Sequence, residues 1–225
     1  IALAAAGSAS ILVTGPFTET NSVASALRWS FSIYAAVATL AYCLRERLPF
    51  GREASTPWLG TSARAVIVAG GSLPVWMLTF ASAAQSIAGQ PLGGPLAGSL
   101  FSKLGPSLSF GIPLAIMMGC YVALAIRDRA PKFMLVGSLA LQVLIVLSLS
   151  LQNIGQPFDI LFVVRVITAV ACGLNIFSIA WFALSHWMGS DDISRDANLT
   201  LMKGHWALAA STVLGLVIWG AGNIV

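Results

Sequence analysis

The chain has 225 residues, of which 57% are hydrophobic and only 9% are charged, and its formal net charge is +4. About a quarter of the residues of a soluble globular domain are charged, so this composition excludes an ordinary soluble protein. The basic residues form no stripe interleaved with aromatic residues in a polar region, which argues against a nucleic-acid partner. The composition is that of a membrane protein.

Long, almost uncharged apolar stretches recur along the chain. A helix needs about 20 apolar residues to cross a hydrocarbon core about 30 Å thick. Stretches of this kind are Trp29–Leu44, Ala65–Ala84, Leu108–Ile126, Phe133–Leu151, Ile160–Leu184 and His205–Ile224. The N-terminal segment Ile1–Val13 adds a short or truncated helix. We therefore expect an all-α protein, a polytopic transmembrane helical bundle of six to eight spans in a single domain over residues 1–225.

Two clusters of basic residues predict the orientation in the membrane. One lies in the loop 45–64 and the other in the connector 127–132. Loops that stay in the cytoplasm are rich in Lys and Arg, so we expect both on the cytoplasmic (or equivalent) side. An even number of crossings must then separate them.

The sequence of the segment Gln85–Ser107 is compatible with more than one placement relative to the membrane. It carries five helix-breaking residues, namely Pro91, Gly93, Gly94, Pro95 and Gly98. Non-helical backbone at membrane depth survives only where protein buries it or a cavity hydrates it. An external interfacial loop, a re-entrant element and a full span are all compatible with this composition.

The connector Arg127–Lys132 resembles the loop between the second and third helices of the major facilitator superfamily, in which an acidic residue precedes a basic pair. The stretch Val164–Gly173 resembles the arginine-then-glycine pattern of that family's fourth helix. Ala130 and Pro131 stand where the family's loop has a glycine, and the likeness covers a minor part of the chain. We assign no family from it.

Arg165 is the strongest candidate for a functional residue. It lies about 9 Å below Asp159 along an apolar helix that contains no acidic residue. A charge at this depth costs several kcal/mol unless it is paired or hydrated, and it often marks a functional site. It either extends to the headgroups or pairs with another residue, or it contacts an anionic ligand. Arg28 and Trp29 begin an earlier span, where they are expected to anchor the helix at the interface.

Polar residues near Arg165 suggest a cavity. Thr168 shares its helical face, and Asn175 lies about 80° around the same helix. Ser138 and Gln142 form a polar pair in the preceding helix. Such side chains usually bond neighbouring helices. The alternative is a polar cavity whose predicted substrate-binding residues are Arg165, Gln142, Thr168 and Asn175.

The remaining chemistry-bearing residues give weak signals. His186 and His205 are expected at the end of one helix and the start of the next, and they are weak candidates for metal or haem ligation because no third ligand accompanies them. Interfacial pairing with the adjacent tryptophans is the simpler interpretation. Gly189–Lys203 is expected to be a solvated loop. The cysteines Cys43, Cys120 and Cys172 lie within apolar stretches and are expected to be buried structural thiols.

Two function classes remain. No catalytic motif is present, no cofactor is required, and no acidic residue lies inside a span, so an enzyme or a carboxylate-based ion-coupled carrier is disfavoured. The first class is a small-molecule transporter or channel-like protein built around a broken helix, with anions among its candidate substrates. The second is a non-catalytic membrane subunit of a larger respiratory or photosynthetic complex, which packs helices and contacts lipid or quinone. Partners of the chain are thus the bilayer and either itself or other membrane subunits.

Overall fold

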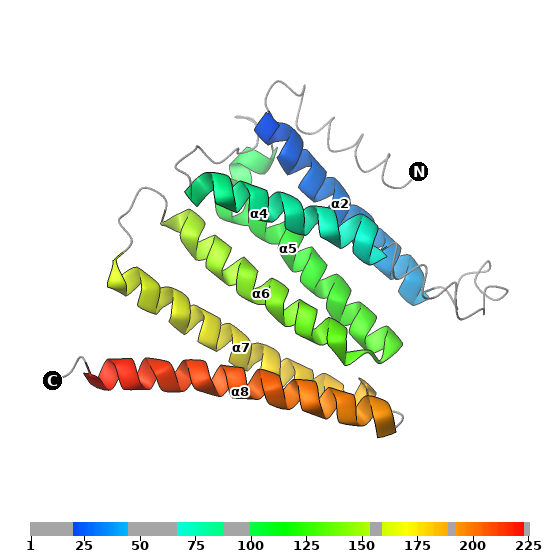
Figure 1. The fold of residues 1–225 in the computed structure, drawn as a ribbon. Coiled ribbons are helices and arrows are strands. Elements are labelled where there is room, and N and C mark those ends of the chain that lie inside the picture. The colour runs from blue at the N-terminus through cyan, green and yellow to red at the C-terminus, as the bar shows by residue number, and fades with distance from the viewer. Residues whose placement is uncertain (1–19, 45–66, 88–99, 154–158, 189–191, 223–225) are drawn as a thin grey trace. The chain divides into compact units, whose positions relative to one another are not determined.

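A computed structural model describes residues 20–44, 67–87, 100–153, 159–188 and 192–222. Every element in these ranges is a helix, which confirms the predicted all-α class for the described chain (Figure 1). The elements are α2 (Thr20–Leu44), the π-helical turn η1 (Val68–Ser72), α4 (Leu73–Ile87), α5 (Leu100–Asp128), α6 (Pro131–Gln152), α7 (Ile160–Met188) and α8 (Asp192–Gly222).

Four helices in the described ranges are long and apolar enough to cross a membrane. Their apolar portions are Ser25–Leu44, Ser107–Asp128, Pro131–Gln152 and Ile160–Ser185. The chain is therefore a multi-pass membrane protein. The expected six to eight spans are not confirmed, and Ile1–Val13 lies outside the described residues.

In two segments, Gln85–Ser107 and Gly189–Lys203, helices extend further than the sequence suggested. Within Gln85–Ser107, α4 continues to Ile87 and α5 starts at Leu100, while the glycine- and proline-rich residues 88–99 lie outside the described ranges. The loop predicted over Gly189–Lys203 is wrong from Asp192 onward, because α8 begins there. Acidic residues near a helix N-terminus favour the helix through its dipole, so this charged stretch is compatible with helix.

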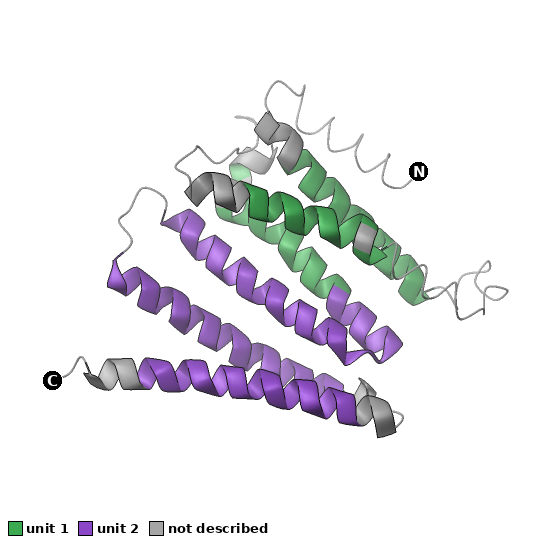
Figure 2. Cartoon of the chain, in the orientation of Figure 1, with its two compact units in different colours: residues 1–120 green, residues 121–225 purple. Residues whose placement is uncertain are grey.

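The chain divides into two compact units, residues 1–120 and 121–225, with the boundary inside α5 (Figure 2). In the first unit, α2 packs against both η1 and α4. Gly71 of η1 makes this approach close, since a Cβ at that position would lie 2.7 Å from the Cβ of Ala35 in α2. The π-helical turn thus places a glycine where the two backbones meet.

Arg28 is buried in the first unit rather than lying at the interface. Arg28 is 0% exposed, and its guanidinium carbon lies 3.6 Å from the centroid of the Phe110 ring. Its Nη2 donates a hydrogen bond to Ser25 Oγ at 3.2 Å. The expectation that Arg28 extends to the headgroups was wrong, because the ring face of Phe110 attracts the cation within the protein.

The second unit contains α6, α7 and α8, which run alternately in opposite directions, and each packs on the other two (Figure 1). α5 ends in a tight turn in which Ala130 N–H donates to Ala125 O at 3.0 Å and Arg129 has a positive φ of 53°. This is the Schellman ending of a helix. Pro131 then begins α6, a position that suits proline because its missing N–H has no intrahelical partner there.

Candidate functional site

His205 is the centre of a buried polar network in the second unit. Its Nε2 lies 2.6 Å from Ser138 Oγ of α6, and its Nδ1 lies 2.8 Å from Ser178 Oγ of α7. All three residues are buried. One imidazole on α8 therefore links three helices through hydrogen bonds.

The hydrogen-bond partners assign the protonation of the ring. Ser178 Oγ donates its single hydrogen to the Leu174 carbonyl at 2.8 Å, so it accepts from His205 Nδ1–H. In a neutral imidazole the other nitrogen is then an acceptor, and Ser138 Oγ donates to it. Every polar atom of this trio is satisfied when His205 is neutral with its hydrogen on Nδ1.

Aromatic rings enclose the imidazole. The ring centroids of Phe177 and Trp181 lie 5.9 Å and 5.5 Å from that of His205. Trp181 is fully buried, and its Nε1 donates to Asn198 Oδ1 at 2.9 Å. Asn198 lies about two turns before His205 on the same face of α8. The network is thus polar at its centre and surrounded by apolar surface.

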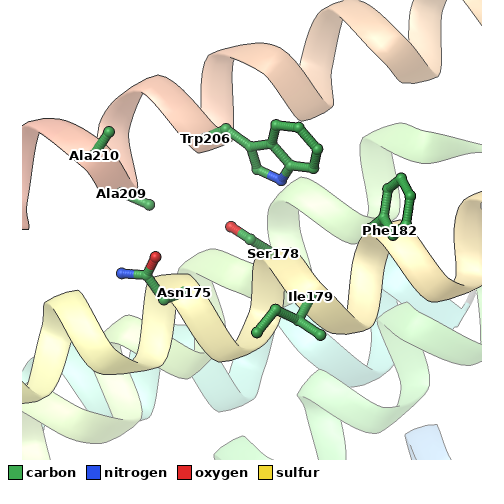
Figure 3. A pocket seen from close by; sticks show the side chains of 7 residues that line it. All are labelled: Asn175, Ser178, Ile179, Phe182, Trp206, Ala209 and Ala210. Atoms are coloured by element: carbon green, nitrogen blue, oxygen red, sulfur yellow. The ribbon is translucent and has the colours of Figure 1, made fainter.

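A groove between α7 and α8 reaches this network. Its volume is about 340 Å³, and the residues that line it are Asn175, Ser178, Ile179, Phe182, Trp206, Ala209 and Ala210. In Figure 3 the side chains of Asn175 and Ser178 extend from α7 toward α8, and the Trp206 indole reaches across from α8. Ser178 therefore belongs both to the groove wall and to the His205 network.

The residues that the structure describes around the groove include polar side chains but no charged one. Asn175 Nδ2 donates to the carbonyl of Ala171 at 2.7 Å, which leaves its amide oxygen to face the groove. The lining suits a molecule that is mostly apolar and carries one or two hydrogen-bonding groups. No protein-family model, curated protein or solved structure matches this chain.

The structure places the four predicted substrate-binding residues at different points of the second unit. Asn175 lines the groove, whereas Arg165 and Thr168 are exposed nearer the start of α7, and Thr168 Oγ1 donates to its own helix at Val164 O. The Gln142 amide of α6 is buried against Gly173 of α7, 3.6 Å from a Cβ at that position. The groove brings Asn175 together with Ser178, not with the other three, and ligand binding by the four stays a prediction.

The histidine pair differs from the expectation in one respect. His205 lies in the interior of α8, about 20 Å from its first residue, because the helix starts at Asp192 and not at His205. The side chain of His186 lies outside the described residues. Where the chain is described, no three His, Cys, Asp or Glu side chains gather into a metal site. Both ring nitrogens of His205 are engaged by serines.

Two of the network residues could have been found from spacing. Buried positions on α7 fall at Leu174, Phe177, Ser178 and Trp181, and those on α8 fall at Asn198, Met202, His205 and Ala209. These intervals of three and four residues mark one helical face each. Placing His205 on such a face, with a serine on the facing stripe, predicts a buried bond between helices. The assumed loop over 189–203 concealed this pattern.

Proposed function

We propose that the chain is a small-molecule transporter whose substrate enters the groove between α7 and α8. The observation that carries the proposal is Ser178, a groove residue that is hydrogen-bonded to the buried imidazole of His205. Polar groups at membrane depth are costly and frequently line a substrate path. A helix bundle with an accessible polar wall is a common form of carrier site.

The lining indicates the substrate class. Asn175 and Ser178 offer hydrogen bonds from one wall, while Ile179, Phe182 and Trp206 offer apolar and aromatic contact. Because none of the described lining residues is charged, an uncharged, largely apolar molecule with one or two polar groups fits best. Binding of an anion is instead proposed for Arg165, which lies outside this groove.

We place the basic segments 45–64 and 127–132 on the cytoplasmic side. This orientation rests on the arginines and lysine of those segments alone. It assigns the tight turn after α5 to the cytoplasmic surface. The C-terminal end of α6 and the start of α7 then lie at the opposite surface.

The alternative is a non-catalytic subunit of a membrane complex. Large apolar side chains outside the groove project outward from α7 and α8, among them Ile176, Leu208, Leu214 and Val217. Lipid covers such a surface in a carrier, and partner subunits cover it in a complex. Native mass spectrometry after gentle extraction separates the two, because a carrier travels alone or as a homo-oligomer and a subunit travels with stoichiometric partners.

Access to the groove from both sides of the membrane is the direct test. The cysteines Cys43, Cys120 and Cys172 are replaced by alanine, and Ala210→Cys is introduced on the exposed groove wall. A charged, membrane-impermeant methanethiosulfonate reagent is then applied to right-side-out and inside-out vesicles. A transporter alternates its access, so the thiol should react in both preparations.

Leu208→Cys is the matched control. Leu208 is 55% exposed and lies about 200° around α8 from Ala210, at nearly the same depth. A thiol there faces lipid and should not react. Reaction of Ala210→Cys from one side only, or equal reaction at both positions, would contradict transport through this groove.

A further inference from the structure

We propose that His205 is the proton-binding group of this groove, and that a neutral ligand in the groove and a proton on His205 oppose each other through Ser178. This deepens the proposed function by naming its coupling ion, and it rests on the groove being the ligand site. The geometry that points to it is a continuous hydrogen-bonded path from the groove wall at Ser178 through His205 to Ser138.

Histidine is the side chain whose charge ordinarily changes between pH 5 and 8. In the neutral state, Ser138 donates to Nε2, and Nδ1–H donates to Ser178. A proton from water must add at Nε2, because Nδ1 already carries one. Ser138 then has to turn its hydrogen away and become an acceptor. The trio therefore has two distinct hydrogen-bond arrangements, one for each charge state.

Among the described residues, no charged side chain bonds to the imidazole and offsets the added charge. The ring contacts Ser138 from α6 and Ser178, Phe177 and Trp181 from α7. The described titratable or charged side chains on these three helices are Lys132 on α6, Arg165 and Cys172 on α7, and Asp196 and Lys203 on α8. None of them bonds to the imidazole; Lys203 is exposed two residues away, on the far side of α8. The imidazolium thus depends on the serines, the ring faces and any water in the groove.

The sign of the coupling follows from Ser178. Its hydroxyl hydrogen is used by the Leu174 carbonyl, so toward a ligand it offers only an oxygen lone pair. A ligand O–H or N–H binds that lone pair more weakly when an imidazolium donates to the same oxygen. The neutral ligand therefore favours neutral His205 when the groove is occupied, so ligand entry releases a proton.

A tethered ligand tests the coupling without knowledge of the natural substrate. The chain contains two histidines, so His186→Gln leaves His205 as the only histidine signal in the NMR spectrum of ¹⁵N-histidine-labelled protein. In the cysteine-free background, Ala210→Cys is modified with 2-hydroxyethyl methanethiosulfonate, which places a neutral hydroxyl group in the groove. The pH midpoint of the His205 signal is measured before and after modification.

We expect Nδ1 to carry the hydrogen at high pH and the modification to lower the proton affinity of His205 about three- to tenfold, the range that one hydrogen bond supplies. The same adduct at Leu208→Cys should leave it unchanged. In a Ser178→Ala background the shift at Ala210→Cys should vanish. This substitution removes one hydroxyl and leaves His205 bonded to Ser138.

The outcomes separate this proposal from transport. An unmoved midpoint, an equal shift from Leu208→Cys or a shift that survives Ser178→Ala overturns the coupling, even if the groove is open to both sides. A shifted midpoint together with one-sided access supports a proton-linked binding site and overturns transport. An upward shift in proton affinity overturns the proposed sign.

Discussion

The guanidinium of Arg28 stacks on the ring of Phe110, with 3.6 Å from its carbon to the ring centroid, and the arginine is fully buried. A buried cation gains from an aromatic face because the ring quadrupole is negative there, and a desolvated contact is worth about 2 kcal/mol or more. The stacking depends on the planar guanidinium, which an ammonium cannot reproduce. The contact between the Arg28 cation and the Phe110 ring therefore stabilises the first unit.

A double-mutant cycle should show this coupling. Arg28→Met and Phe110→Leu should each destabilise the protein, and their combined effect should be smaller than the sum by about 1–2 kcal/mol. Equilibrium unfolding in mixed detergent micelles measures the four free energies. Additive effects would contradict the stacking, and Arg28→Lys should resemble Arg28→Met more than the wild type.

Gly71 should not tolerate a methyl group. Gly71→Ala would place its Cβ 2.7 Å from Ala35 Cβ and 3.2 Å from Ala35 Cα. One of these atoms is backbone, so α2 and η1 must separate, which costs about 1–3 kcal/mol. A lower thermal midpoint in nanodiscs checks this expectation.

Gly70 is the matched control next to Gly71. A Cβ at Gly70 would meet its nearest atom, Tyr34 Cε1, at the ordinary contact distance of 3.7 Å. Gly70→Ala should therefore leave the midpoint unchanged or raise it slightly, because alanine favours helix over glycine. Equal loss of stability in both variants would contradict the prediction that the space available to the new Cβ determines the effect of each substitution.

A glycine in place of Arg129 should stabilise the turn after α5. Arg129 has φ 53°, a left-handed conformation that costs a residue with a Cβ about 1 kcal/mol. Arg129→Gly removes that cost but adds freedom to the unfolded chain, so the net gain should be about 0.5 kcal/mol or slightly more. Ala130→Gly, at φ −110°, should give no gain. Chemical denaturation of the two variants decides between these outcomes.

The sequence predicted the helices better than it predicted their contacts. Apolar stretches such as Phe133–Leu151 and Ile160–Leu184 coincide closely with α6 and α7, because the length of an apolar run is a local property. The start of α8 was missed since the acidic residues around Asp192 lower the hydropathy without breaking a helix. This error placed His205 at the start of a helix, whereas it lies in the interior of α8.

The site depended on tertiary contacts that no local pattern fixes. Ser138 and His205 are 67 positions apart, and only the packing of α6 on α8 brings them within 2.6 Å. Asn175, selected because it is polar on an apolar helix, lines the groove between α7 and α8, and its binding of a ligand stays a prediction. Gln142 and Thr168 were selected by the same criterion, yet one is buried against Gly173 and the other bonds its own helix. Polarity alone does not distinguish these environments.

Arg165 provides a test of anion binding that is independent of the groove. Its side chain is exposed on α7, so a small anion can approach it. If it holds an anion, native mass spectrometry of the wild type should show the adduct and Arg165→Gln should lose it, whereas Arg165→Lys should retain part of it. An adduct that persists in Arg165→Gln would contradict this role.

Asn198 should stabilise the fold because it accepts the indole hydrogen of Trp181. The bond is 2.9 Å long and both residues are buried. Asn198→Leu leaves that N–H buried without an acceptor, and it should cost about 1–3 kcal/mol of unfolding free energy. Trp181→Phe removes the donor, so adding Asn198→Leu to it should cost much less. Thr168→Val, which removes an exposed bond within one helix, should stay within about 0.5 kcal/mol of the wild type. If Asn198→Leu costs no more than Thr168→Val, the Trp181–Asn198 bond does not stabilise the packing of α7 on α8.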